Sequence, residues 1–168
     1  MLGETLRDKH VVILGLARQG AALARFLVEA GADVTVSDVK GEDALAEQLE
    51  ELADLPIRYA LDGHPIRLLD DADLLCVSGG VPLDIPIVEK AHKRGIPLSN
   101  DAQIFLDRCP APVIGITGSA GKTTTTALVG EMCREAGLRT WVGGNIGNPL
   151  IEDLEAIRAE DWVVMELS

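Results

Sequence analysis

The sequence has few aromatic side chains, few cysteines and no long apolar run. Aromatic residues make up 3% of the 168 residues, so the core must be built from valine, isoleucine, leucine and alanine. The three cysteines, Cys76, Cys109 and Cys133, are widely spaced, which argues against a disulfide framework and favours reduced, structural thiols. There is no signal peptide and no stretch of membrane-spanning length, so we expect a cytoplasmic protein.

Positive charge is also scarce. Fifteen basic side chains face 27 acidic ones, and the formal net charge is −12. A surface this acidic disfavours nonspecific binding to nucleic acid or to an anionic membrane. A local site for an anion can still form from backbone N–H groups, one lysine and a metal ion. We therefore expect a monomer that binds small molecules, with neither nucleic acid nor membrane as a partner.

The sequence does contain an alternation of short apolar strands and helical segments, which is typical of an α/β fold with a parallel sheet. Residues 1–110 are predicted to form one Rossmann-like domain, with strands at 11–15, 34–36, 57–59, 74–77 and 96–98 and helices at 19–30, 42–55 and 85–94. Two prolines in the segment 109–112 then predict a domain junction. An ordinary loop inside one domain is the alternative.

The pattern restarts after the junction. We expect strands at 113–116, 140–142 and 162–167, a helix ending near Ala136 and a glycine-rich loop at 143–149. Residues 111–168 are too few for a doubly wound sheet of their own. We therefore expect them to be the first part of a second domain, and the chain to be the front part of a longer protein.

A glycine-rich loop between the strand at 113–116 and the following helix has the context of a P-loop. Glycines 118 and 121 let backbone N–H groups approach phosphate oxygens, Lys122 can neutralise phosphate charge and act in catalysis, and the Thr123 hydroxyl can bind Mg²⁺. Ile116 occupies the position where the usual pattern begins with glycine, and a chance glycine turn is the alternative. The loop predicts a central domain that binds ATP with Mg²⁺, through Gly118, Ser119, Ala120, Gly121, Lys122, Thr123 and Thr124.

A weaker motif lies near the N-terminus. Residues 15–20 have the spacing of a dinucleotide fingerprint, but Ala17 replaces the glycine that normally lets the backbone approach a pyrophosphate. Asp38, at the end of the second strand, lies where an acidic residue meets a ribose hydroxyl. Ser78, Gly79 and Gly80 form another donor-rich loop after a strand. Each of these loops is open to two interpretations, a nucleotide site or a purely structural turn.

One carboxylate stands out in an apolar strand. Glu166 ends the run Val163–Met165, and burying it unpaired would be costly, so we predict a second Mg²⁺ ligand beside Thr123. An exposed strand-end acid is the alternative. The histidines His10, His64 and His92 are scattered without a partner pattern, and we expect surface or loop roles for them.

These motifs together resemble the Mur ligase family of peptidoglycan synthesis, and within it the branch that adds D-glutamate. The stretches that carry the resemblance span the chain: 11–20, 36–38, 78–80, 115–126, 142–147 and 165–168. The resemblance implies a UDP-binding N-terminal domain and a central ATPase domain. It also implies that ATP activates the carboxylate of UDP-N-acetylmuramoyl-L-alanine as an acyl phosphate, which the amine of D-glutamate then attacks.

The same resemblance implies roles for individual residues. The UDP substrate is expected to contact Arg18, Gln19, Asp38, Val39, Lys40, Ser78, Gly79 and Gly80, and its muramoyl part is expected to contact Asn145 and Ser168. Gly79 stands where relatives can carry proline, which leaves the shape of that loop open. A fragment of this length is expected to bind its ligands poorly and not to turn over.

Other functions remain open from the sequence alone. The chain could belong to another Mur ligase or to an enzyme like folylpolyglutamate synthase. It could also be an NAD-binding oxidoreductase, although Ala17 and the second nucleotide loop count against this. The last alternative is a non-catalytic module that binds a nucleotide or UDP-sugar.

Overall fold

The computed structural model describes residues 5–167, which fall into two compact units. The division lies between Asp101 and Ala102. The proline-containing segment 109–112, where a junction is predicted, lies further along the chain within the second unit. No helix among residues 5–167 combines the length and apolar character that a membrane crossing requires.

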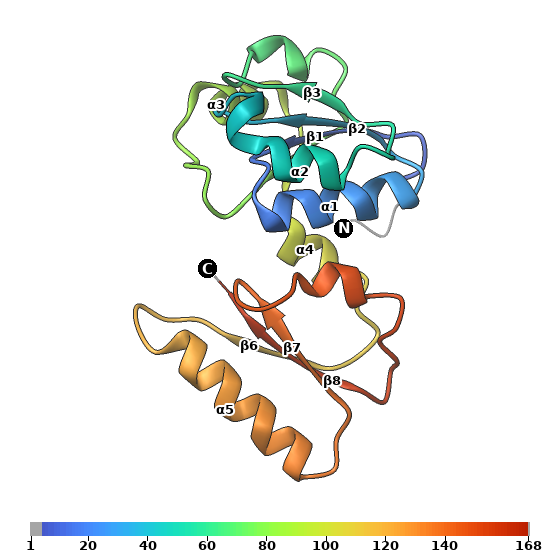
Figure 1. The fold of residues 1–168 in the computed structure, drawn as a ribbon, viewed down its shortest axis with the longest axis vertical. Coiled ribbons are helices and arrows are strands. Elements are labelled where there is room, and N and C mark those ends of the chain that lie inside the picture. Colours follow the sequence, from blue (N-terminus) through green and yellow to red (C-terminus); the bar gives the residue numbers. More distant parts are fainter. Residues whose placement is uncertain (1–4, 168) are drawn as a thin grey trace. The chain divides into compact units, whose positions relative to one another are not determined.

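The first unit contains one sheet of five parallel strands (Figure 1), in the order β3-β2-β1-β4-β5. This confirms the predicted parallel α/β sheet. The strands are β1 (His10–Leu14), β2 (Asp33–Ser37), β3 (Arg58–Ala60), β4 (Leu74–Val77) and β5 (Leu98–Ser99). They are connected by α1 (Arg18–Glu29), the pair η1 (Glu42–Leu45) and α2 (Ala46–Glu51), η2 (Ile66–Leu69) and α3 (Pro86–Arg94).

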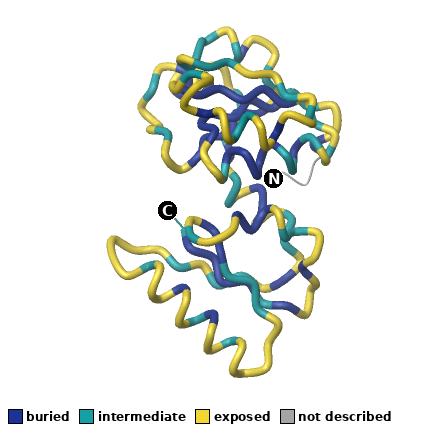
Figure 2. The backbone as a smooth tube through the Cα atoms, in the orientation of Figure 1, coloured by how far each residue is buried: buried dark blue, intermediate teal, exposed yellow. Residues whose placement is uncertain are grey.

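The central strands of this sheet are covered on both faces. All residues from Val11 to Leu14 are fully buried, and they appear dark blue in Figure 2. On one face, η2 and α3 pack on an apolar cluster that includes Val12, Leu14, Leu75 and Val77. The helix α1 contacts β1 and β2 and buries Leu23 and Leu27. Continuous apolar strands are expected where a parallel sheet is covered in this way.

The cysteines behave as predicted, since all three are free thiols. Burial raises the pKa of Cys76, in β4, to about 12. This thiol therefore stays protonated at neutral pH and acts as a small apolar side chain in the core.

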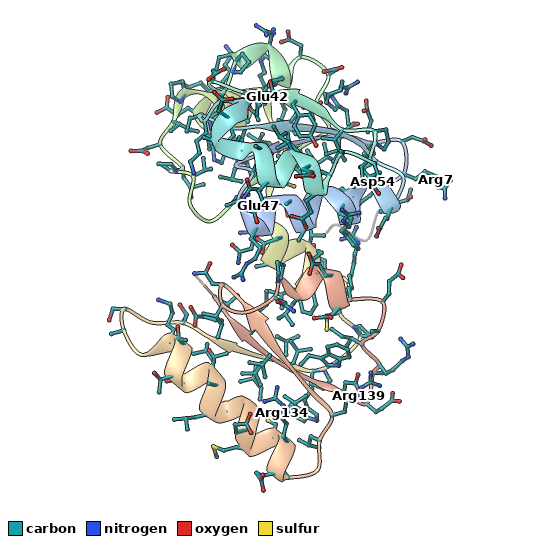
Figure 3. All side chains as sticks on the ribbon, in the orientation of Figure 1. Arg7, Glu42, Glu47, Asp54, Arg134 and Arg139 are labelled. Atoms are coloured by element: carbon teal, nitrogen blue, oxygen red, sulfur yellow. The ribbon has the colours of Figure 1, made fainter. Side chains whose placement is uncertain are left out.

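The continuous acidic helix predicted over 42–55 was wrong. The segment instead forms a short 3₁₀ turn, η1, followed by the six-residue helix α2. Leu45 and Leu52 are buried, and both leave helical geometry, at φ −120° and −105°. The backbone leaves helical geometry at Leu45 and Leu52 because both side chains are buried in the core. Glu42 and Glu47 on the same segment are exposed (Figure 3).

The second unit contains three parallel strands in the order β6-β8-β7. They are β6 (Val113–Ile116), β7 (Thr140–Gly144) and β8 (Trp162–Glu166), with α5 (Lys122–Glu135) between β6 and β7 and the turn η3 (Leu150–Asp153) between β7 and β8. The short helix α4 (Asp101–Leu106), which buries Ile104 and Phe105, was not anticipated.

The helix α5 packs on its sheet through small residues. Only Thr126 and Gly130 are buried along its length. A Cβ atom at Gly130 would lie 2.5 Å from Cγ2 of Val142, so glycine lets the helix approach β7 closely. The apolar side chains of Leu128 and Met132 are exposed, at 59% and 69%.

Candidate functional site

The loop between β6 and α5 has the geometry that phosphate binding needs. Gly118 has a φ of 150° and Gly121 a φ of 75°, values that side chains other than glycine rarely adopt. Gly121 is the N-cap of α5, and no side chain caps this end of the helix. The N-terminal end of α5, with its partial positive charge, is therefore open toward the loop.

The backbone N–H groups of this loop are not used within residues 5–167. No hydrogen bond from the amides of residues 118–124 to another part of the described chain is found, and the first engaged amide is that of Thr125, which donates to Gly121 O over 2.9 Å. All of residues 117–121, 123 and 124 are exposed. A set of free, exposed amides at a helix start is an anion-binding surface.

The side chain of Lys122 folds back onto the loop that precedes it. Its Nζ donates a hydrogen bond to Gly118 O over 3.0 Å, so the ammonium group lies back over the loop rather than extending into solvent. The Thr126 hydroxyl, one turn further, donates to Lys122 O over 2.8 Å and fixes the first turn of α5. The predicted phosphate contacts are thus brought together on one short segment.

Glu166 lies at the end of the central strand β8, where Ile116 of β6 and Gly144 of β7 are its partners in register. Its side chain is 5% exposed, and Oε2 has no hydrogen-bond partner within the described residues. A buried carboxylate oxygen without a partner is costly, and a divalent cation is one way to satisfy it. The exposed alternative for Glu166 is therefore wrong.

The described residues contain no group of three or more histidine, cysteine or acidic side chains that could hold a metal by themselves. A cation beside Glu166 would need other oxygen ligands. A threonine hydroxyl, phosphate oxygens and water are ligands that Mg²⁺ accepts. The residues present therefore fit a Mg²⁺ ion shared with a bound nucleotide.

The glycine-rich loop after β7 is hydrogen-bonded to the end of β8. Asn145 N donates to Glu166 O over 3.0 Å. Gly144 has a φ of 103°, and a Cβ atom there would lie 2.4 Å from Glu166 O. Glycine is therefore required at this position, and Asn145 is held next to the strand that carries Glu166. Ser168, the other residue predicted to touch the muramoyl group, lies outside the described residues.

In the first unit, the predicted nucleotide loops meet at the carboxyl edge of the sheet. The turn after β1 and the loop after β4 touch, since the Ser78 hydroxyl donates to Gly15 O over 3.2 Å. The strand order changes direction between β1 and β4, which is where ligands bind in open parallel sheets. Arg18, Gln19, Val39, Lys40, Gly79 and Gly80 lie at the start of α1 or directly after β2 and β4, at this edge.

Backbone geometry and packing explain why glycine occurs at positions 15 and 20 of the N-terminal fingerprint. Gly15 has a φ of 92°. A Cβ atom at Gly20, in the first turn of α1, would lie 2.0 Å from Gly15 O. The spacing therefore lets α1 pack tightly on the turn, and Ala17 is the exposed N-cap residue of α1. A tight turn explains the motif without a pyrophosphate.

Asp38 braces the same edge. Its Oδ2 accepts a hydrogen bond from Leu16 N over 2.7 Å, and its Oδ1 accepts one from Lys40 N over 2.9 Å. Asp38 is 8% exposed. Its hydrogen bonds connect the turn at residues 15–20 to the end of β2. Its predicted contact with a ribose stays a prediction, as do the ligand contacts of the other residues at this edge.

His64 lies in a loop, as expected, but its hydrogen bond was not anticipated; the same expectation was wrong for His10, which begins β1. Nδ1 of His64 lies 2.8 Å from the hydroxyl of the buried Ser37, directly before Asp38. The Ser37 hydroxyl donates to Gly63 O over 2.9 Å, so Nδ1 of His64 carries the proton and donates to Ser37. Burial lowers the pKa of His64, and the charge of Asp38 opposes this shift. The signal was its position, shortly after a strand at the nucleotide edge.

Comparison with known proteins identifies relatives of both units. Residues 9–100 match the family model of the MurD-like N-terminal domain of Mur ligases. The UDP-N-acetylmuramoylalanine--D-glutamate ligase of Geotalea uraniireducens is 48% identical over 165 residues, and that of Symbiobacterium thermophilum is 45% identical over 168 residues. These alignments cover 97% and 100% of this chain but 36% and 37% of the relatives, so the chain spans about a third of their length.

Solved structures give the same family. A pseudomurein peptide ligase type C from Methanothermus fervidus is 28% identical with a TM-score of 0.53, and it is matched over 95% of this chain and 33% of its own. The UDP-N-acetylmuramate-alanine ligase MurC of Thermotoga maritima is 25% identical with a TM-score of 0.54, over 95% of this chain and 36% of its own.

Proposed function

Because the chain belongs to the Mur ligase family, with an N-terminal domain of the MurD-like kind, we propose that the whole protein joins D-glutamate to UDP-N-acetylmuramoyl-L-alanine at the expense of ATP, in peptidoglycan synthesis. The relatives that cover this chain at 45–48% identity carry that activity in their names. ATP and a nucleotide-linked substrate are both cytoplasmic metabolites, and we place the reaction in the cytoplasm.

The observation that supports ATP binding most directly is the set of free amides at residues 118–124, with Lys122 folded over them. These amides are fixed by the backbone before any ligand binds. Donors arranged in advance stabilise charge on a transferring phosphoryl group without reorganisation during the reaction. Lys122 would exchange its bond to Gly118 O for phosphate oxygens and neutralise their charge.

Thr123 and Glu166 would hold Mg²⁺ together with oxygens of the nucleotide. The unpartnered, buried Oε2 of Glu166 supports this assignment. Bound there, the ion would supply charge neutralisation to the phosphates.

The first unit would bind the uridine diphosphate end of the substrate. Asp38 and Ser78 hold the loops after β1, β2 and β4 in one arrangement, and the exposed residues Arg18, Val39 and Lys40 lie beside them. Asn145, anchored to the strand of Glu166, would contact the muramoyl group.

The proposed chemistry proceeds in two steps. The carboxylate of the substrate L-alanine attacks the γ-phosphorus of ATP, the bond to the β-phosphate oxygen breaks, and ADP leaves. The amine of D-glutamate then attacks the acyl carbon, loses a proton and displaces phosphate, which leaves an amide. Lys122 acts in the first step by holding the γ-phosphoryl group and its charge in line.

The test is phosphate release by the full-length protein. Release should require both UDP-N-acetylmuramoyl-L-alanine and D-glutamate. Lys122→Ala should lower the rate by about 100-fold or more, because a charge contact made in the transition state is lost. Thr125→Ala is the matched control, since this exposed hydroxyl follows the loop and has no hydrogen-bond partner within residues 5–167.

Two outcomes would overturn the proposal. One is release that proceeds equally with another amino acid in place of D-glutamate, which would point to a different ligase. The other is tight binding of NADH with no preference for UDP, which would favour the oxidoreductase alternative. Unchanged turnover in the Lys122→Ala enzyme would remove the role given to that side chain.

A further inference from the structure

One face of the first sheet changes from apolar to polar between β1 and β2. On the face where η2 and α3 cover Val12 and Leu14, the register places the polar residues of β2 beside them. Thr35 is opposite Val12 on one side and Arg58 on the other, and Asp33 is opposite His10. The apolar cluster under η2 and α3 includes no residue of β2 or β3, so this half of the face is built from polar side chains.

A hollow of about 300 Å³ lies over this polar half. It is lined mainly by His10, Thr35, Arg58, Arg67, Leu68 and Asp71. His10 and Arg58 are the first residues of their strands, and Asp71 precedes β4. The hollow is therefore near the amino ends of the parallel strands, whereas Asp38 and Ser78 follow their carboxyl ends. Its volume is at the lower end of the range for small-molecule sites.

The lining carries donors that the protein does not use. Arg58 donates from Nε to Thr35 Oγ1 over 3.1 Å and from Nη2 to Asp33 over 2.7 Å. Its Nη1 makes no hydrogen bond within residues 5–167. The exposed residue Arg67 has no guanidinium hydrogen bond or ion pair to any described residue. Two arginines with unused N–H groups thus line one small hollow.

His10 adds a buried polar atom. Its Nε2 lies 3.0 Å from Thr35 Oγ1. Its Nδ1 lies 3.1 Å from Asp71 Oδ1, but outside hydrogen-bonding geometry, and it is buried without a hydrogen-bond partner in the described part of the chain. A buried nitrogen without a well-aligned hydrogen bond is costly, so a further partner at this atom would be favourable.

The lining itself carries more positive than negative side chains, although Arg58 already pairs with Asp33 just outside it. The lining contains two permanently positive side chains and one carboxylate, that of Asp71. This is the reverse of the chain as a whole, which has 27 acidic and 15 basic residues. Guanidinium groups present paired N–H donors that match the oxygens of phosphate and carboxylate.

We propose that this hollow is a binding site for a small oxyanion, a phosphate or carboxylate group held by Arg58 and Arg67 with His10 beneath them. The site does not depend on the ligase reaction, because His10, Arg58 and Asp71 lie near the amino ends of the strands, whereas the loops assigned to the nucleotide follow the carboxyl ends.

The test is a backbone amide NMR titration of the 168-residue chain with inorganic phosphate and, separately, with succinate at constant ionic strength. Saturable shifts are expected at residues 35, 58, 67 and 68. This readout is resolved from phosphate binding at residues 118–124. Shifts with phosphate alone would assign a phosphoryl ligand, and shifts with succinate alone would assign a dicarboxylate.

Two substitutions should act in opposite directions. Arg67→Gln should weaken binding about tenfold, the usual effect of losing a charged hydrogen bond. Asp71→Asn should tighten it about threefold, because the one lining carboxylate is neutralised. Arg7→Gln and Asp84→Asn are the charge-matched controls and should leave the affinity unchanged; both side chains are exposed, and Arg7 projects away from the fold (Figure 3).

The proposal is overturned if neither anion gives saturable shifts at these residues, or if shifts appear only at 118–124. It is also overturned if Arg67→Gln, folded as judged by its spectrum, binds as tightly as the original chain. If Arg67→Gln and Arg7→Gln lowered the anion affinity equally, the binding would depend on the net charge of the chain rather than on this site.

Discussion

The central strands of the two parallel sheets are buried alike, but the helices that pack on them are buried to different degrees. In the first unit, the residues from Val11 to Leu14 are fully buried and α1 buries six residues. In the second unit, the central strand β8 is likewise buried from Val163 to Glu166, but its edge strand β6 has no buried residue and α5 buries two. Figure 2 shows dark blue strand segments in both units and a largely yellow α5 in the second.

The candidate sites of the two units also differ. The nucleotide edge of the first unit is held by contacts between distant segments, such as Asp38 with Leu16 and His64 with Ser37. The phosphate loop is shaped by its own backbone and by Lys122, four residues from its partner Gly118. A site of the first kind depends on contacts between distant segments, whereas one of the second kind depends on the conformation of one short segment.

The largest expected effect is on the core of the first unit. Leu75→Ala, at a fully buried position of β4, should lower the free energy of unfolding by about 2–5 kcal/mol through lost burial and a cavity. Leu128→Ala, on the exposed face of α5, should change it by less than about 0.5 kcal/mol. Denaturant unfolding followed by amide NMR would measure both. Equal losses would contradict the difference between the units.

A smaller effect is expected from the loop beside Glu166. Gly144→Ala should cost about 3 kcal/mol, because its Cβ would press on Glu166 O at a positive φ. Gly147→Ala is the control: its φ is 63°, nothing lies within 4 Å of its Cβ position, and we expect roughly 1 kcal/mol. Trp141 and Trp162 both lie in the second unit, so tryptophan fluorescence reports its unfolding. A tolerated Gly144→Ala would mean that the loop is not fixed to β8.

The smallest expected effect is on the pH dependence of stability, which can be measured for each unit separately. Hydrogen bonds from Trp141 Nε1 and Arg158 N hold the pKa of Asp161 below its ordinary value. The folded second unit therefore gains stability from ionised Asp161 above the ordinary pKa, near 4, and loses it as pH falls through the lowered pKa. Asp161→Asn should flatten this acid slope in tryptophan fluorescence.

Asp73 is the counterpart in the first unit. The backbone N–H of His10 lowers the pKa of Asp73, with Lys9 contributing. Asp73→Asn should flatten the acid slope of the first unit, followed at its amides, and leave the fluorescence transition unchanged. If Asp73→Asn altered the tryptophan signal as much as Asp161→Asn, the two units would not unfold separately.

The strands and the phosphate loop could be predicted because their signals are local. Apolar runs mark β1, β4 and β8, and the glycines at 118 and 121 mark a loop between a strand and a helix. The acidic helix failed because Leu45 and Leu52 are drawn into the core at its ends, which depends on tertiary packing. The hydrogen bonds of Asp38 could not be predicted from spacing, since they require knowing that β2 lies between β1 and β3.

The most direct test of the account is a titration of the full-length protein with Mg²⁺ and ATP, followed at the backbone amides. The account predicts shifts concentrated at residues 118–124 and at Glu166, which are lost in Lys122→Ala and retained in Thr125→Ala. An absence of shifts at these amides with millimolar ATP, or binding that Lys122→Ala leaves unchanged, would contradict it.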